Sequence, residues 1–249
     1  MVPVSCRIGR RKGEGAERIA EVKALIFDFD GLICDTETPE FDSWSREFEA
    51  HGVELSLDEW IQCVGAGSGA WDAYDHLQSL VGRRLDREQV ESSRRRRFTE
   101  LIGAFGVLPG VAELLSSAEA EGVLVAIASS STSVWVDHHL RRLALDQLFP
   151  VVITRDQAGA AKPDPAVYLK AAERLGVLPC ESVALEDSTL GVESAKRAGM
   201  SVIAVPNRIT ARFDLSKADL VVPSLADVSL GQIRELHASR SLLARSSEC

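Results

Sequence analysis

Residues 22–37 read Val-Lys-Ala-Leu-Ile-Phe-Asp-Phe-Asp-Gly-Leu-Ile-Cys-Asp-Thr-Glu, and this stretch decides the fold. Its first six residues are almost all apolar, as is typical of a strand buried on both faces of a parallel sheet. Because side chains alternate along a strand, Asp28 and Asp30 point to the same side where the strand ends. Open α/β sheets bind ligands at this end of their strands. The two carboxylates therefore mark a candidate ligand-binding site. From this stretch alone, the alternative is that the two aspartates only cap the strand before a turn.

The rest of the chain alternates between buried strands and helices. Further strands are expected at residues 123–128, 150–154, 182–185, 201–205 and 219–222. This alternation predicts an α/β fold with a doubly wound, Rossmann-like parallel sheet and right-handed crossovers. Between the first two strands there is only helical spacing, as in Phe41, Trp44 and Phe48, which predicts a small all-helical cap inserted after the first strand.

These patterns divide the chain into expected regions. We expect a core of residues 22–37 and 106–230, a helical cap of residues 38–105, a disordered N-terminal arm of residues 1–21 and a C-terminal tail of residues 231–249. The glycine-rich residues 65–69 follow no buried strand, so they indicate a turn in the cap and not a nucleotide loop.

Composition narrows the class of partner. The 249 residues carry a net charge of -9, which disfavours nucleic acid as a partner. No apolar stretch approaches the roughly 20 residues that span a membrane. The five cysteines are scattered without a Cys-x-x-Cys pair, as in reduced cytoplasmic proteins. We expect a cytoplasmic protein that is a monomer or a small homo-oligomer.

Polar side chains also follow the other strands, where they would meet Asp28 and Asp30 at one edge of the sheet. They are Ser129 and Ser130 after the second strand, Lys162 beyond the third, and Glu186 and Asp187 after the fourth. Carboxylates are ligands that Mg²⁺ prefers, and the cation lets an anionic nucleophile approach an anionic phosphate. A hydroxyl and a lysine can hold the phosphoryl oxygens. The set predicts magnesium-assisted phosphoryl transfer.

The order of four motifs resembles that of the haloacid dehalogenase superfamily over roughly residues 22–225. The motifs are Asp28-Phe29-Asp30-Gly31, Ala128-Ser129, Lys162-Pro163 and Glu186-Asp187-Ser188. The similarity is to the subfamily I phosphatases with a small helical cap, the β-phosphoglucomutase-like group.

This resemblance implies a phosphatase that acts on a small phosphorylated metabolite, such as a sugar phosphate. It implies that Asp28 attacks phosphorus to form an aspartyl-phosphate and that Asp30 is the general acid and base. Mg²⁺ would be held by Asp28, the backbone carbonyl of Asp30 and Asp187, with Glu186 binding directly or through water. The resemblance further implies that Ser129, Ser130 and Lys162 bind the phosphoryl group.

Other chemistries of the superfamily fit less well. Dehalogenases lack the second aspartate, and the phosphonate hydrolases use a cap lysine, whereas residues 41–108 contain no lysine. Sugar phosphomutases share every core motif, but their cap histidine corresponds to Glu40 here, and the loop of residues 63–74 has no arginine or lysine to hold a second phosphate. Hydrolysis is therefore favoured over mutase activity. A non-catalytic binding protein is a further alternative, although no catalytic position is missing.

Three other features are interpreted from spacing alone. Residues 94–97 are four consecutive arginines, which would point all round a helix. We interpret them as a solvated surface run, with a phosphate-binding patch as the alternative. His138 and His139 are adjacent, so they diverge on a helix, and both are expected at the surface. Thr36 and Glu37 are expected to mark the hinge on which the cap moves.

Overall fold

A six-stranded parallel sheet forms the centre of the computed structural model, which describes residues 21–65 and 71–246. The strands run in the order β3-β2-β1-β4-β5-β6. Their bounds are β1 (Ala24–Phe27), β2 (Leu124–Ala128), β3 (Val151–Ile153), β4 (Ser182–Glu186), β5 (Ser201–Ala204) and β6 (Leu220–Val221). Each strand lies within about two residues of its expected position, so the predicted doubly wound α/β fold is confirmed.

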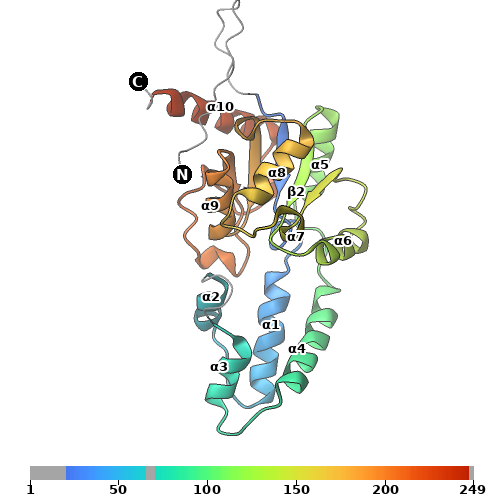
Figure 1. The fold of residues 1–249 in the computed structure, drawn as a ribbon, viewed down its shortest axis with the longest axis vertical. Helices are drawn as coiled ribbons and strands as arrows, with labels where there is room; N and C mark the ends of the chain where they lie inside the picture. Colours follow the sequence, from blue (N-terminus) through green and yellow to red (C-terminus); the bar gives the residue numbers. More distant parts are fainter. Residues whose placement is uncertain (1–20, 66–70, 247–249) are drawn as a thin grey trace, which may run out of the picture.

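Helices cover both faces of this sheet (Figure 1). The core helices are α5 (Val111–Ala120), α6 (Ser133–Arg142), α7 (Arg155–Ala158), α8 (Ala166–Leu175), α9 (Thr189–Arg197) and α10 (Leu230–Ser246). Residues 231–246, expected as a tail, thus belong to α10, and Ile233 of this helix is buried against the core. The N-terminal arm expected at residues 1–21 lies outside the described residues, apart from Glu21.

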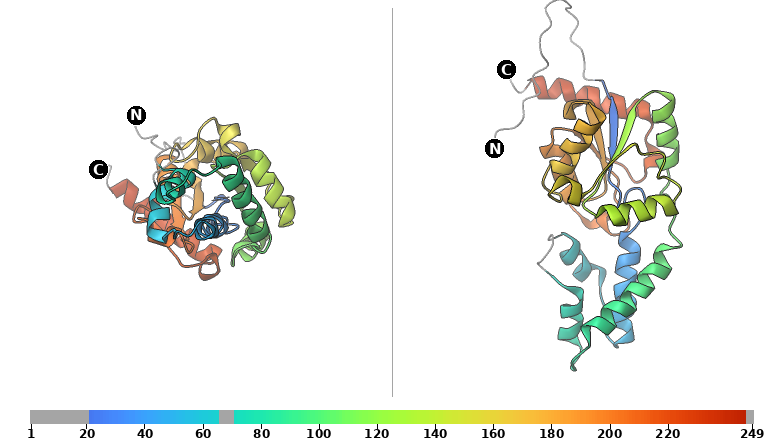
Figure 2. Two further views of the ribbon diagram at one scale, coloured as in Figure 1. Left: turned by 90° about the horizontal axis from the view of Figure 1, so that it is seen from below. Right: turned by 45° about the vertical axis from the view of Figure 1, so that its right-hand side comes forward.

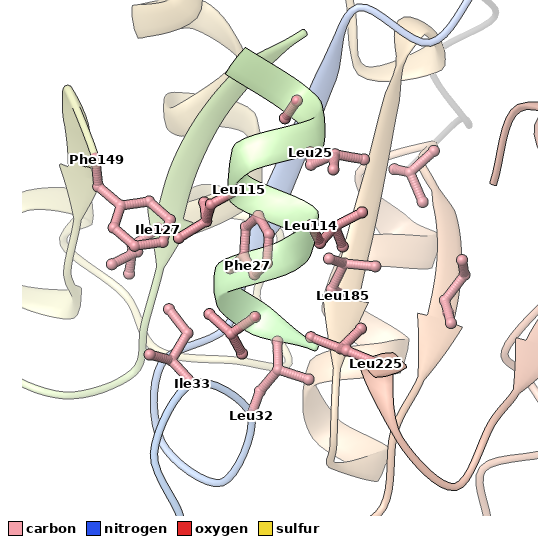
Figure 3. Close-up of a cluster of buried hydrophobic side chains, with 14 of the residues drawn as sticks. Leu25, Phe27, Leu32, Ile33, Leu114, Leu115, Ile127, Phe149, Leu185 and Leu225 are labelled. Carbon is pink, nitrogen blue, oxygen red and sulfur yellow. The ribbon is translucent and has the colours of Figure 1, made fainter. Parts of the chain in front are cut away.

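Alternation along β1 divides the core into two layers. Leu25 and Phe27 pack with Leu114 of α5 in one cluster, which Figure 3 shows in close-up. Ile26 points the other way and packs with α8 and α9 in a second cluster. Since every residue of β1 is fully buried, burial of each large side chain stabilises the fold by about 1.5–3 kcal/mol. A strand buried on both faces needs the unbroken apolar run that the sequence shows.

The helices that follow β1, up to Ile102, form the predicted helical cap, whereas α5, between the cap and β2, belongs to the core (Figure 2). The cap helices are α1 (Glu37–Ala50), α2 (Leu57–Gly65), α3 (Ala73–Leu80) and α4 (Arg87–Ile102). They lie beyond one end of the sheet, where α1 and α4 run side by side. Buried Trp44, Trp60 and Tyr74 belong to the apolar cluster of the cap, so their main role is packing. The turn expected at residues 65–69 lies outside the described residues after Gly65.

None of the helices described here combines the length and the apolar composition that crossing a membrane requires.

Gly110 permits a close contact between the start of α5 and the loop that precedes α10. Its φ is +88°, and a Cβ would lie 2.1 Å from the backbone nitrogen of Ala226. Gly122 has a φ of +68° but no neighbouring atom within 4 Å.

We expect Gly122→Ala to lower the free energy of unfolding by about 1–2 kcal/mol, and Gly110→Ala by about 3–5 kcal/mol. Both changes place a side chain at an unfavourable φ, but only Gly110→Ala also adds a clash with the backbone. Urea unfolding followed by circular dichroism measures both, and equal losses would contradict the assigned clash.

Candidate active site

Three buried carboxylates meet where β1 and β4 end. Phe27 is level with Leu185 in the paired strands, so Asp28 and Glu186 follow at the same height of the sheet. Among the described residues, Asp28, Glu186 and Asp187 each offer an oxygen, and these oxygens all lie within 4.8 Å of one another. Their exposed fractions are 6%, 0% and 2%. Such a group of hard oxygen donors is suited to a divalent cation.

Lys162 neutralises part of this negative charge. Its Nζ donates to Asp28 Oδ1 and, at 2.5 Å, to Glu186 Oε1. Burial alone would lower the pKa of Lys162, but the carboxylates of Asp28 and Glu186 hold the pKa above its ordinary value. The lysine therefore keeps its charge next to the predicted nucleophile.

Glu186 is the most firmly held of the three carboxylates. Besides Lys162, it accepts hydrogen bonds from Tyr168 Oη at 2.6 Å and from the hydroxyl and backbone nitrogen of Ser188. A Cβ at Gly191 would lie 1.9 Å from its carboxylate carbon, so glycine leaves the space that this carboxylate occupies. Sequence reasoning missed Tyr168, because its spacing on α8 is that of any core residue.

Crowding of the carboxylates changes their affinity for protons. Burial raises the pKa of Asp28 to about 8; Lys162 opposes this shift, while Glu186 and Asp30 add to it. The pKa of Asp187 is also raised, by burial and then by Asp28 and Glu186. A divalent cation at this group would relieve the repulsion between its members. The residues present therefore fit a metal ion.

The Asp30 carboxylate is turned toward α6. Its Oδ2 accepts hydrogen bonds from Ser131 Oγ at 2.7 Å and Ser129 Oγ at 3.3 Å, and its Oδ1 accepts one from Trp135 Nε1 at 2.8 Å. Within the described residues, Asp30 contributes no carboxylate oxygen to the three-carboxylate group. This is compatible with metal binding through its backbone carbonyl. Ser131 and Trp135 were not singled out from the sequence.

Ser129 and Ser130 lie beside these groups, as expected from their position after β2. Ser129 is fully buried, and its Oγ accepts a hydrogen bond from the backbone nitrogen of Ser131 at 2.9 Å. Ser130 Oγ accepts one from the backbone nitrogen of Lys162 at 3.1 Å, which fixes the lysine loop next to β2. The structure thus brings together every site residue predicted from the sequence.

A cavity of about 780 Å³ lies over this cluster and is lined by both core and cap. The cap contributes Glu37 and Glu40 from α1 and Arg94, Arg95 and Phe98 from α4. A molecule bound to Lys162 would therefore also meet cap side chains.

The arginine run is only partly the solvated surface expected from its sequence, because Arg95 and Arg96 are exposed whereas Arg94 is not. Arg94 is only 18% exposed in its side chain and pairs with Glu40 at 2.6 Å. Its guanidinium lies 5.5 Å from the ring centroid of Trp44. The interpretation was wrong for this residue because α4 packs against α1, which the spacing of four identical residues does not reveal.

His139 is likewise buried, with 2% exposure, whereas His138 is exposed as expected. Burial, then the charge of Arg142 and the neighbouring His138, lower the pKa of His139 to about 4. The imidazole is therefore neutral at pH 7.

The fold and the site together define an α/β enzyme whose charged groups stand at the carboxyl edge of a parallel sheet under a helical cap. Residues 25–205 match the model of the haloacid dehalogenase-like hydrolases. The chain belongs to this family, and it is a phosphoric monoester hydrolase of the haloacid dehalogenase superfamily.

Known proteins of this family are similar over most of the chain. The YhcW protein of Bacillus subtilis (strain 168) is 40% identical over 209 residues, covering 84% of this chain and 94% of the relative. A phosphorylated carbohydrates phosphatase of Thermotoga maritima is 33% identical over 190 residues, covering 73% of this chain and 84% of the relative. The crystal structure of CbbY from Rhodobacter sphaeroides in complex with phosphate superimposes with a TM-score of 0.66 at 25% identity, covering 85% of this chain and 98% of that one.

Glu37 is a titratable group on the cap side of the cavity. Burial, and then the carboxylates of Asp30, Glu40 and Asp35, raise its pKa from 4.5 to about 8. The folded protein therefore holds this proton more tightly than the unfolded chain does, so its contribution to stability is lost as the pH rises from about 4.5 through 8. We expect Glu37→Gln to reduce the loss of stability between pH 5 and pH 8.5 by about 1–2 kcal/mol.

Urea unfolding in EDTA at these two pH values measures this difference. The exposed Glu54 supplies the matched control, Glu54→Gln, which should leave the pH dependence as in the wild type. A Glu37→Gln variant with the wild-type pH dependence would contradict the assigned shift.

Proposed function

We propose that this protein is a Mg²⁺-dependent phosphatase that hydrolyses a small phosphorylated metabolite, a sugar phosphate, through an aspartyl-phosphate on Asp28. The observation that carries this proposal is the position of Asp28. It is buried at the base of the cavity, paired with Lys162, and grouped with Glu186 and Asp187.

In the first step, a carboxylate oxygen of Asp28 attacks phosphorus as the bond between phosphorus and the ester oxygen breaks. Asp30 gives a proton to the departing oxygen, which leaves as the alcohol. Lys162, Ser129 and Ser130 hold the phosphoryl oxygens during the transfer. Lys162 is suited to this role because its charge is retained at the nucleophile.

In the second step, water attacks phosphorus and the bond to Asp28 breaks. Asp30, now deprotonated, accepts a proton from the water. The products are inorganic phosphate and the restored carboxylate of Asp28. Asp30 thus acts once as an acid and once as a base, and the enzyme ends as it began.

The residues that would hold Mg²⁺ are Asp28, Asp187 and the backbone carbonyl of Asp30, with Glu186 binding directly or through water. When bound, the cation supplies positive charge that offsets the repulsion between carboxylate and phosphate. Asn207 Nδ2 donates to Asp187 Oδ2 at 2.8 Å, which orients this carboxylate.

Two observations support a sugar phosphate as substrate. The Thermotoga maritima relative is named for phosphorylated carbohydrates. The cavity of about 780 Å³ has room for a small metabolite and offers the polar cap side chains of Glu37 and Glu40 to hydroxyl groups. A free small molecule, and not nucleic acid, also agrees with the net charge of -9. We place this activity in the cytoplasm.

Phosphate release from a panel of sugar phosphates and p-nitrophenyl phosphate, with Mg²⁺ or EDTA, tests this function. We expect release that requires Mg²⁺ and falls by about 1,000-fold or more in Asp28→Asn, because the amide is a poor nucleophile. The exposed Asp227 supplies the control, Asp227→Asn, which should retain wild-type activity. The proposal fails if the wild type hydrolyses no ester or if Asp28→Asn retains its rate.

One observation favours sugar phosphomutase activity as a second candidate. A mutase must hold a second phosphate, and Arg94 and Arg95 of α4 bring to the cavity the cations that residues 63–74 lack. Glu40 already pairs with Arg94, however, which leaves less charge for a second phosphate and favours hydrolysis. With β-glucose 1-phosphate as substrate, we expect more inorganic phosphate than glucose 6-phosphate. Isomerisation with little phosphate released would establish the mutase instead.

A further inference from the structure

Trp135 connects the Asp30 carboxylate to helix α6. This tryptophan lies in the first turn of α6 and lines the cavity. Its indole Nε1 donates to Oδ1 of Asp30 at 2.8 Å, while Ser131 Oγ donates to Oδ2 at 2.7 Å. Both carboxylate oxygens are therefore fixed, and among the described residues Asp30 is not a member of the three-carboxylate group. Loss of either donor would leave one of these oxygens without the hydrogen bond that fixes it.

The same indole ring also contacts the cap. Its centroid lies 5.7 Å from that of Phe98 on α4, with an angle of 37° between the ring planes. It lies 4.1 Å from the ring centroid of His139 on its own helix. Figure 2 shows α6 at the end of the core that faces the cap. Trp135 thus contacts a cap helix and the predicted acid and base at the same time.

Helix α6 is bonded to both connections between core and cap. Arg142 donates through Nη1 to the carbonyl oxygen of Phe105 at 2.8 Å and through Nη2 to Cys34 Sγ at 3.4 Å. Its Nε donates to Nδ1 of His139 at 3.1 Å. Arg142 therefore fixes the neutral ring of His139, which packs against the ring of Trp135. A shift of the cap would reach Trp135 through Phe98 and through these connections.

We propose that Trp135 is a positioning residue that makes the orientation of the Asp30 carboxylate depend on the position of the cap. This proposal rests on the proposed function only in taking Asp30 as the proton donor and acceptor. Trp135 itself neither gives nor takes a proton; its N–H fixes Oδ1, and its ring follows Phe98. Protonation of the leaving group would then be efficient only while the cap is in place over the substrate.

Leaving groups of different acidity separate positioning from a general structural role. A sugar alkoxide needs a proton as it departs, whereas p-nitrophenolate leaves readily without one. In Trp135→Phe, which keeps an aromatic ring but lacks the N–H, we expect kcat/KM for the best sugar phosphate to fall about 10-fold or more. For p-nitrophenyl phosphate we expect a fall of less than about threefold. Phe98→Leu should change the same ratio in the same direction, but less.

The control is Val134→Ala, because Val134 neighbours Trp135 on α6 and is 79% exposed. Thermal unfolding checks that all variants are folded. If Trp135→Phe lowers kcat/KM equally for both substrates, or for neither, the proposal is overturned while the phosphatase function remains intact. Absence of hydrolysis by the wild type would instead overturn the function.

A crystal structure of Trp135→Phe tests the positioning role without turnover. We expect the Asp30 carboxylate to rotate out of the position in which Trp135 and Ser131 hold it in the wild type. An unchanged carboxylate in this variant would also overturn the proposal.

Discussion

The site depends on one buried interaction, in which the ammonium group of Lys162 lies between the carboxylates of Asp28 and Glu186. Removing these charges from water is costly, and the cost is offset only when geometry is good and the remaining lone pairs are satisfied. Here Tyr168 and Ser188 donate to Glu186, and the lysine loop is fixed by Ser130. Much of the local structure around β1 and β4 therefore serves to hold one cation against several anions.

This arrangement leaves a net negative group that a metal ion would complete. Lys162 offsets part of the charge, but burial and mutual repulsion still raise the pKa of Asp28 and Asp187. The same crowding that raises these pKa values makes the group of carboxylates attractive to a cation. The repulsion among the buried carboxylates thus both costs folding free energy and favours the binding of a cation.

The helical cap also contributes side chains to the site. It has its own apolar cluster, yet α1 and α4 also line the cavity above the carboxylates. The pair formed by Glu40 and Arg94 places opposite charges on the cap side of the cavity. Phe98 of the cap contacts Trp135, which in turn donates a hydrogen bond to Asp30, the proposed general acid and base. In the proposed mechanism, substrate recognition and proton transfer are therefore connected by a few side chains.

The sequence alone determined the fold class and the positions that meet at the sheet edge, because strand periodicity and strand ends are local properties. Asp28, Ser129, Lys162 and Glu186 could be found in this way, since parallel strands place their carboxyl ends together. Ser131, Trp135 and Tyr168 could not, because a hydroxyl, an indole and a phenol on ordinary helical or loop positions carry no sign of which carboxylate they will reach.

The partial burial of Arg94 and the full burial of His139 were also decided only by tertiary structure, since they depend on which helix packs against which face. Local patterns thus determined where the chemistry lies, and packing between distant segments decided how each of its groups is held.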